Sequence, residues 1–207
     1  MIAIVDYGVG NLFSLKSSFL SLGVPVKVCK TEEEIKNADK IILPGVGAFP
    51  DAAEKLKATG LDKVIIEEVK KGKKLMGICL GMQLLFEKSF EYGEHQGLGL
   101  IKGEIRPISE VITGDLKIPH MGWNALDFTE NETPIFKNIK NGDHVYFVHS
   151  FYAKTESQFV TATSEYGGKV TASVQCGNVF GCQFHPEKSG ETGLKILKAF
   201  CDLEEKK

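Results

Sequence analysis

The chain has 207 residues, of which 43% are hydrophobic and 25% charged, and its formal net charge is -2. These values are typical of one globular domain with a core of its own, and they exclude a disordered or collagen-like chain. The charge argues against nucleic acid as an obligatory partner. No apolar run reaches the roughly 18 residues that a membrane helix needs.

Cysteine usage and the first residues indicate a compartment. Five cysteines are spread thinly, and residues 1–10 lack the basic lead of a secretory signal. We therefore expect reduced thiols, a cytoplasmic location and one domain over residues 1–207. Three of the histidines, at positions 95, 144 and 149, show no metal-site spacing relative to the cysteines, so we predict no metal and no cofactor.

The first half alternates strand and helix patterns with short connections. Strands are predicted at 2–6, 25–29, 40–43 and 74–79. Helices are predicted at 11–22, from a capping box at 31–34, and at 49–58, 61–71 and 80–88. This alternation is typical of a parallel sheet with helices on both faces.

The second half changes to short runs rich in β-branched and aromatic residues. These runs lie at 100–106, 144–151, 158–165, 168–175 and 178–184, and residues 107–143 contain most of the irregular structure. A final helix is predicted at 191–204. We therefore expect an α/β fold: a single domain with an open mixed sheet, a parallel core, helices on both faces and antiparallel hairpins added in the C-terminal half.

The sharpest motif is Gly77-Ile78-Cys79-Leu80-Gly81, where an apolar strand ends and a helical pattern begins. This is the strand–turn–helix context of a nucleophile elbow. The tight turn needs small neighbours on both sides of the nucleophile. The backbone N–H groups that follow it favour a thiolate and can hold an oxyanion. The alternative is a buried cysteine at a strand end between incidental glycines.

A thiol nucleophile needs a base and a group that orients the base. Both are available in His185-Pro186-Glu187, which follows the last predicted strand. His185 can serve as the base and Glu187 as the orienting carboxylate. Taken alone, His185 is equally consistent with a structural histidine and Glu187 with a surface carboxylate; the combination with Cys79 favours a hydrolytic triad.

Two glycine-rich segments follow other predicted strands. Residues 44–47, Pro-Gly-Val-Gly, can expose a second oxyanion donor opposite Cys79, or they are only a strand-to-helix turn. Residues 8–10, Gly-Val-Gly, lack the third glycine of a dinucleotide fingerprint because Phe13 stands there. We therefore exclude a nicotinamide or flavin site.

Residues 77–83 together with 185–187 resemble the triad, or class I, glutamine amidotransferases. Three further segments narrow the match: Asp-Tyr-Gly-Val-Gly-Asn at 6–11, Pro-His-Met-Gly-Trp-Asn at 119–124 and Tyr-Phe-Val-His-Ser at 146–150. With these segments the whole chain resembles the glutaminase subunits of imidazole glycerol phosphate synthase.

The resemblance implies that the chain hydrolyses glutamine to glutamate and ammonia. It also implies a heterodimer with a (β/α)8-barrel cyclase, which uses the ammonia to make imidazole glycerol phosphate and AICAR in histidine biosynthesis. The alternative is a paralogous subunit that feeds another synthase, such as one acting on a cell-surface sugar. Peptidase and chaperone relatives place a histidine directly after the cysteine, where this chain has Leu80.

Residue roles follow from the resemblance by position. The catalytic residues would be Cys79, His185 and Glu187, and the oxyanion amides would be those of Val46 and Leu80. The glutamine-binding residues would be Gly47, Gln83, Ser150 and Phe151. The residues at or near the partner interface would be Asn11, His120, Met121, Trp123, Asn124, Tyr146 and Lys188.

Trp123 is the only tryptophan of the chain and stands beside Met121 in an irregular segment. An aromatic side chain and a methionine outside the core fit an interface patch. The alternative is that Trp123 fills the core of its own domain. Glycines on both sides of Val46 make rotation of its peptide inexpensive, so we expect the isolated chain to be slow until a partner binds.

Overall fold

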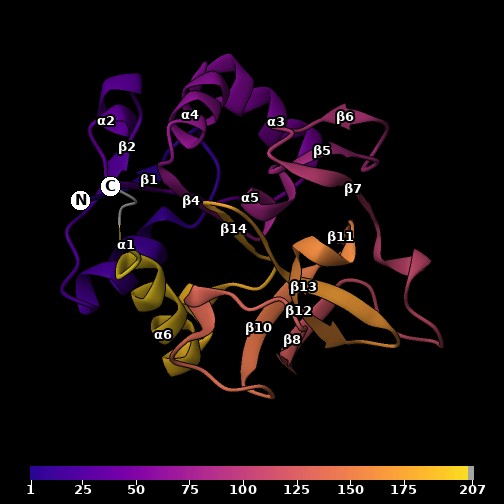
Figure 1. The fold of residues 1–207 in the computed structure, drawn as a ribbon. Coiled ribbons are helices and arrows are strands. Elements are labelled where there is room, and N and C mark those ends of the chain that lie inside the picture. The colour runs from indigo at the N-terminus through magenta and orange to yellow at the C-terminus, as the bar shows by residue number, and fades with distance from the viewer. Residues whose placement is uncertain (205–207) are drawn as a thin grey trace.

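The computed structural model describes residues 1–204, and its centre is an eight-stranded mixed sheet (Figure 1). The strand order is β2-β1-β3-β4-β14-β13-β12-β9. The parallel strands are β1 (Ile2–Val5), β2 (Val26–Cys29), β3 (Lys40–Leu43), β4 (Lys74–Ile78) and β14 (Val179–Cys182). The antiparallel strands are β13 (Lys169–Cys176), β12 (Val160–Glu165) and β9 (Asp127–Phe128). The predicted mixed sheet with a parallel core is confirmed.

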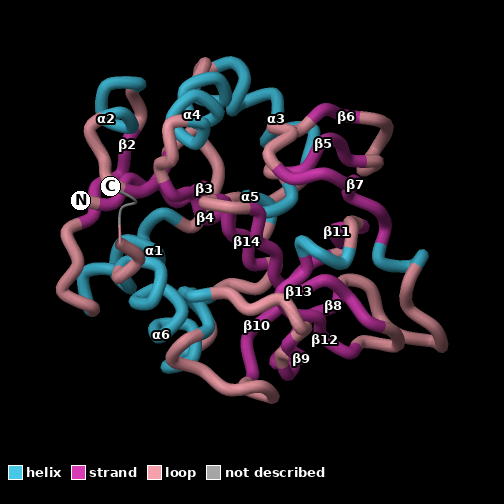
Figure 2. The backbone as a smooth tube through the Cα atoms, in the orientation of Figure 1, coloured by secondary structure: helices cyan, strands magenta, loops and turns pink. Residues whose placement is uncertain are grey.

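Helices cover both faces of the parallel half (Figures 1 and 2). One face is covered by α1 (Leu12–Ser21) and α6 (Gly190–Cys201), and the other by α2 (Glu32–Lys36), α3 (Phe49–Ala58) and α4 (Leu61–Lys70). Strand β1 shows why both faces are needed. Ile2 and Ile4 pack with α1 and α6, whereas Ala3 and Val5 pack with α3 and α4. Alternating side chains point to opposite faces, so a wholly apolar strand must be covered twice.

Two small sheets depart from the expected hairpin additions. Strands β12, β13 and β14 do extend the main sheet, as predicted. However, β10 (His144–His149) pairs with β8 (His120–Ala125) in a separate sheet. A third sheet has the order β11-β7-β5-β6, formed by β5 (Phe86–Ser89), β6 (His95–Gln96), β7 (Ile101–Pro107) and β11 (Phe151–Lys154). Short 3-10 turns complete the chain at η1 (Ile108–Glu110), η2 (Pro134–Phe136), η3 (Ser157–Phe159) and η4 (Pro186–Lys188).

The predicted helix at 80–88 is wrong in its second half. Helix α5 (Leu80–Gln83) has a single turn, and residues 86–89 form β5 instead. The reason is tertiary: β5 pairs in parallel with β7, and Phe86 is fully buried in the core. A local apolar pattern cannot distinguish a buried helix turn from a short buried strand.

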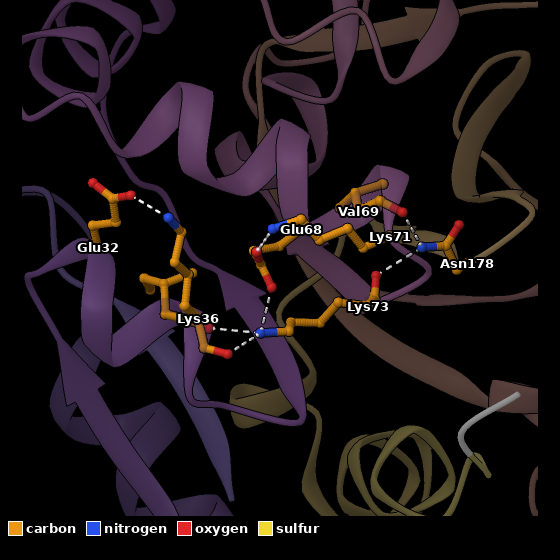
Figure 3. Close-up of polar contacts among 8 residues, drawn as sticks. Glu32, Lys36, Glu68, Val69, Lys71, Lys73 and Asn178 are labelled. Carbon is orange, nitrogen blue, oxygen red and sulfur yellow. Dashed lines mark hydrogen bonds and ion pairs between the residues drawn. The ribbon is translucent and has the colours of Figure 1, made fainter. Parts of the chain in front are cut away.

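An ion-pair cluster around the buried Glu68 carboxylate fixes the start of β4, the strand that leads to Cys79 (Figure 3). The Glu68 carboxylate, 7% exposed, lies 2.7 Å from Lys71 Nζ and 2.8 Å from Lys73 Nζ. Lys73 Nζ also donates to the carbonyl oxygens of Ile35 and Lys36 at the end of α2. Asn178 Nδ2 donates to the carbonyl oxygens of Val69 and Lys73. The cluster therefore joins α2, α4 and the turn before β14 at one end of the sheet.

At the other end of β4, helix α5 lies unusually close to the strands. A Cβ atom on Gly77 would lie 2.6 Å from the carbonyl oxygen of Gly81. A Cβ atom on Gly81 would overlap with the carbonyl oxygen of Leu43, and one on Gly45 would lie 2.7 Å from the amide nitrogen of Gly81. Gly77 and Gly81 thus provide the space that the turn at Cys79 needs.

We expect Gly81→Ala to lower the free energy of unfolding by about 3 kcal/mol or more, because its Cβ meets backbone that cannot move aside. Gly142→Ala is the control: Gly142 has φ +89° and nothing within 4 Å of the added Cβ, so only the left-handed backbone is penalised, by about 1–2 kcal/mol. Urea denaturation of both variants measures the difference. Equal losses would contradict the proposed close packing of α5.

Candidate active site

Cys79 stands on a strained turn between β4 and α5. Its φ is 55° and its ψ is -114°, one of two positive φ values among the described non-glycine residues. A residue other than glycine rarely adopts such a backbone conformation unless the surrounding structure imposes it. The surroundings here are the backbone contacts of Gly77 and Gly81 and a 2.7 Å hydrogen bond from the Cys79 amide to the Cys182 carbonyl. The Cys79 side chain is held at the carboxyl edge of the sheet.

His185 and Glu187 reach the same edge because β14 runs parallel to β4. Cys182 is opposite Ile78 in the register, so both strands end side by side. His185 Nδ1 lies 2.8 Å from Glu187 Oε1, and both side chains are at most 3% exposed. With Nδ1 bonded to the carboxylate, Nε2 is left to face the thiol. Burial alone would lower the pKa of His185, but hydrogen bonds and charge interactions with Cys79 and Glu187 raise it to about 10.

A pocket of about 300 Å³ opens over these residues. Its lining includes Cys79, His185, both expected oxyanion residues and all four residues expected to bind glutamine: Val46, Leu80, Gly47, Gln83, Ser150 and Phe151. Glu187 stands behind His185, bonded to its ring. The structure therefore brings together residues from four separate stretches of sequence in one cavity, which is large enough for an amino acid.

The segment after β3 lies against the elbow. Gly45 packs on Gly81, and Tyr7, buried beneath it, donates from its hydroxyl to the carbonyl oxygen of Pro44 at 2.7 Å. Burial of the Tyr7 hydroxyl and its proximity to Cys79 raise its pKa. Gly47 has φ +97°, and the Val46 side chain is 41% exposed. Val46 and Gly47 therefore line the same pocket as Cys79.

Glu91 lines the pocket and is not recognisable in the sequence. It lies in the loop after β5, is 9% exposed, and accepts a 2.8 Å hydrogen bond from the amide of Phe49 at the start of α3. Burial is the main cause that raises the pKa of its carboxyl. The position of Glu91 depends on its contact with Phe49, which is distant in the sequence, and no local motif indicates that contact.

The Phe151 carbonyl organises the pocket floor. It accepts hydrogen bonds from His149 Nδ1 at 2.8 Å and from Gln83 Nε2 at 3.2 Å. Gln83 Nε2 also donates to Gln183 Oε1 at 3.1 Å. Both hydrogens of the Gln83 amide are therefore used inside the protein. Gln83 can meet a bound molecule only through its carbonyl oxygen, as an acceptor.

His149 is a neutral buried histidine. Burial lowers its pKa to about 3, and its Nδ1 proton is directed at the Phe151 carbonyl. Its Nε2 lies 3.0 Å from His120 Nδ1. The His120 ring is stacked between Phe147 and Tyr166, and its other nitrogen lies 3.0 Å from Asn124 Oδ1.

The expected interface residues separate into exposed and buried groups. Met121 is 59% and Trp123 54% exposed, and the Trp123 ring meets Tyr146 edge-on. Trp123 does not fill the core. His120, in contrast, is fully buried: it supports the strand that carries Met121 and Trp123.

The remaining expected interface residues come from separate parts of the chain. Asn11 caps α1 by accepting from the amide of Ser14, and Asn124 donates to the carbonyl of Glu165. Lys188 lines the pocket.

Within residues 1–204, no group of three or more His, Cys, Asp or Glu side chains is placed to hold a metal ion. In the same residues, no helix is long and apolar enough to span a membrane.

Comparison with known families decides among the enzymes that use such an elbow. The family model for class I glutamine amidotransferases matches residues 3–203. The chain belongs to the class I glutamine amidotransferase family. This amidotransferase is 52% identical over 204 residues to the imidazole glycerol phosphate synthase subunit HisH of Caldanaerobacter subterraneus, a match that covers 98% of both chains.

Two further relatives carry the same name. The HisH of Oceanobacillus iheyensis is 50% identical, over 98% of this chain and 99% of the relative, and that of Wolinella succinogenes is 44% identical, over 98% and 100%. Among solved structures, one titled as a glutamine amidotransferase superposes with a TM-score of 0.74 at 18% identity, covering 97% of this chain and 100% of the other. PurLQS from Thermotoga maritima gives a TM-score of 0.73 at 22% identity, with 97% of each covered. These structures share the fold.

We expect the pH dependence of stability to carry the signature of His149. Its pKa is about 3 in the fold and about 6.5 in the unfolded chain, so below pH 6.5 the unfolded state takes up a proton that the folded state refuses. Stability from this group is complete above pH 6.5 and is lost as the pH falls toward 3. Between pH 7.5 and pH 5 the loss is about 2 kcal/mol.

Urea denaturation of the unaltered chain and of His149→Gln at both pH values measures this contribution. The variant should lose less stability on acidification than the unaltered chain. His144→Gln is the matched control, because His144 is exposed. If the His149 and His144 variants lost equal stability on acidification, His149 would not be buried in its neutral form.

Proposed function

We propose that this amidotransferase is the glutaminase subunit of an imidazole glycerol phosphate synthase, and that the whole chain works as one domain. The observation that carries the proposal is the buried His185–Glu187 pair beside Cys79 in a pocket that also holds Glu91 and Gln83. The relatives named as HisH, 44 to 52% identical over 98% of the chain, support the choice of synthase. The five free cysteines support action in the cytoplasm.

In the proposed reaction the Cys79 thiolate attacks the side-chain carboxamide carbon of glutamine. The thiol proton resides on His185 Nε2, and Glu187 stabilises the resulting imidazolium through Nδ1. The carbonyl oxygen becomes an oxyanion, which the backbone N–H groups of Leu80 and Val46 are proposed to hold. Each such donor contributes roughly a hundred- to a thousand-fold to the rate.

The tetrahedral intermediate collapses when His185 returns its proton to the departing nitrogen. Ammonia leaves, and the γ-glutamyl group remains on Cys79 as a thioester. A water molecule then attacks this thioester, giving its proton to His185. The C–S bond breaks, glutamate leaves, and the sulfur is restored as thiolate beside the imidazolium.

The polar groups of the pocket suit the other end of glutamine. The Glu91 carboxylate and the Gln83 carbonyl oxygen are both acceptors, so they fit the α-ammonium of the substrate. The backbone of Gly47, Ser150 and Phe151 supplies further polar contacts. The product, glutamate, carries a negative charge on its side chain where the substrate has a neutral carboxamide. This additional charge favours release of the product.

The partner is proposed to be a (β/α)8-barrel cyclase that receives the ammonia. Its docking surface would include Met121 and Trp123, two exposed apolar side chains on β8, with Tyr146 behind them. Asn11, Asn124 and Lys188 would supply polar contacts around this patch. Large exposed apolar side chains rimmed by polar groups are typical of protein–protein interfaces.

We expect Cys79→Ala to abolish glutamine hydrolysis and to leave synthesis from added ammonium salt intact in the complex, because only the source of ammonia is lost. Rates with glutamine and with ammonium, measured side by side with the cyclase, test this. Cys176→Ala is the control, since Cys176 lies on β13 and does not line the pocket. Retention of most glutamine-dependent turnover by the Cys79 variant would refute the assignment.

We expect Trp123→Ala to weaken binding of the cyclase by about thirtyfold, as for a central aromatic residue of an interface, without changing the stability of the isolated chain. Leu20→Ala on α1 serves as control, because Leu20 has a similar exposure of 56%. Calorimetric titration gives the affinities. An unchanged affinity in the Trp123 variant would place the interface elsewhere.

The expected activation is tested by measuring glutamine hydrolysis for this chain alone, with the cyclase, and with the cyclase plus its nucleotide.

A further inference from the structure

Gln183 is a fully buried polar residue between β14 and His185 that the scheme above does not use. Its backbone amide donates to the Ala172 carbonyl at 2.9 Å, which continues the ladder to β13. Its side chain points in the other direction, to Gln83 and to Cys79. A buried carboxamide is costly to retain unless both its donor and its acceptor are bonded, so the identity of its partners matters.

The hydrogen-bond partners fix which end of Gln183 faces the sulfur. The Phe151 carbonyl can only accept, so the Gln83 side chain must direct its NH2 group toward it. The same NH2 group lies 3.1 Å from Gln183, which must therefore present its oxygen to Gln83. The opposite end of the Gln183 amide, its NH2 group, is then directed at Cys79 Sγ, 3.9 Å away.

The surroundings of Cys79 Sγ distinguish its neutral and ionised forms. As a thiol it directs its proton at the Val148 carbonyl, at 3.9 Å. As a thiolate it has no proton to give, and the donors that face it are the His185 ring and the Gln183 amide. A hydrogen bond to an ionised acceptor is about twice as strong as one to a neutral acceptor. The Gln183 contact therefore favours the thiolate over the thiol.

We propose that Gln183 is a positioning residue for the nucleophile: its side-chain N–H donates to the Cys79 sulfur, stabilises the attacking thiolate and holds it in place beside the end of β14. This inference rests on the proposed function only in taking Cys79 as the nucleophile. The chain Phe151–Gln83–Gln183–Cys79 also ties the sulfur to the pocket floor, so the atom that attacks and the groups that bind the substrate share one set of hydrogen bonds.

Two substitutions separate donation to the sulfur from support of Gln83. Gln183→Glu keeps an oxygen that accepts from Gln83 and replaces the donor to Cys79 with a second oxygen. Gln183→Leu removes both contacts. Ser173→Ala is the control, because Ser173 is a buried polar residue opposite Cys182 whose hydroxyl donates to the Gly181 carbonyl. The readouts are the pH profile of Cys79 alkylation by iodoacetamide, and kcat and KM for glutamine.

The expected result is that both Gln183 variants alkylate Cys79 at least about tenfold more slowly at pH 7, which corresponds to loss of a hydrogen bond to a charged group. The profile moves to higher pH, kcat falls in parallel, and KM of Gln183→Glu stays within about threefold of the unaltered chain. Ser173→Ala keeps the alkylation profile. A loss of stability in the Gln183 variants with an unchanged alkylation profile would overturn the proposal.

A measurement on the unaltered chain covers the case in which a variant does not fold. The side-chain amide resonances of Gln183, followed by NMR, should shift over the pH range in which alkylation accelerates, and they should not do so in Cys79→Ala. Resonances that do not shift over that pH range would overturn the proposal. The alkylation and NMR readouts need no glutamine, so a failure of the proposed glutaminase activity would be seen separately.

Discussion

The backbone of α5 lies against the backbones of β3 and β4 at a distance that only glycine permits. Gly77, Gly81 and Gly45 meet there, and each would place a Cβ atom on a neighbouring main-chain atom. This contact compresses the turn between them, so Cys79 is forced to a φ of 55°. The same contact brings the segment after β3 to the pocket that Cys79 lines. The positions of Cys79 and of this segment thus follow from one packing constraint.

The parallel register of β4 and β14 supplies the rest of the site. Because the two strands end together, the residues that follow them are neighbours although about a hundred positions separate them in sequence. Gln183 stands beneath the sulfur, His185 beside it and Glu187 behind the ring. The ion-pair cluster of Glu68 with Lys71 and Lys73 anchors β4 at its opposite end, so a displaced start of the strand would displace Cys79 as well.

Much of this arrangement can be predicted from the sequence because local patterns encode it. The alternating strands and helices of the first half predict the parallel sheet, and the glycine spacing around Cys79 predicts the turn. The small sheets are less accessible, since the pairing of β5 with β7 and of β8 with β10 depends on contacts that no local period reveals. The burial of His120 and the places of Glu91 and Gln183 depend in the same way on partners far along the chain.

The place of β14 has a consequence for how the molecule is made. It is the last strand of the chain, yet it lies between β4 and β13 near the middle of the sheet. Until it has left the ribosome, the sheet consists of two unjoined pieces, each with an open edge available to other chains. Its insertion closes both edges and brings His185 to Cys79, which was synthesised long before. Completion of the sheet and assembly of the pocket are therefore a single event.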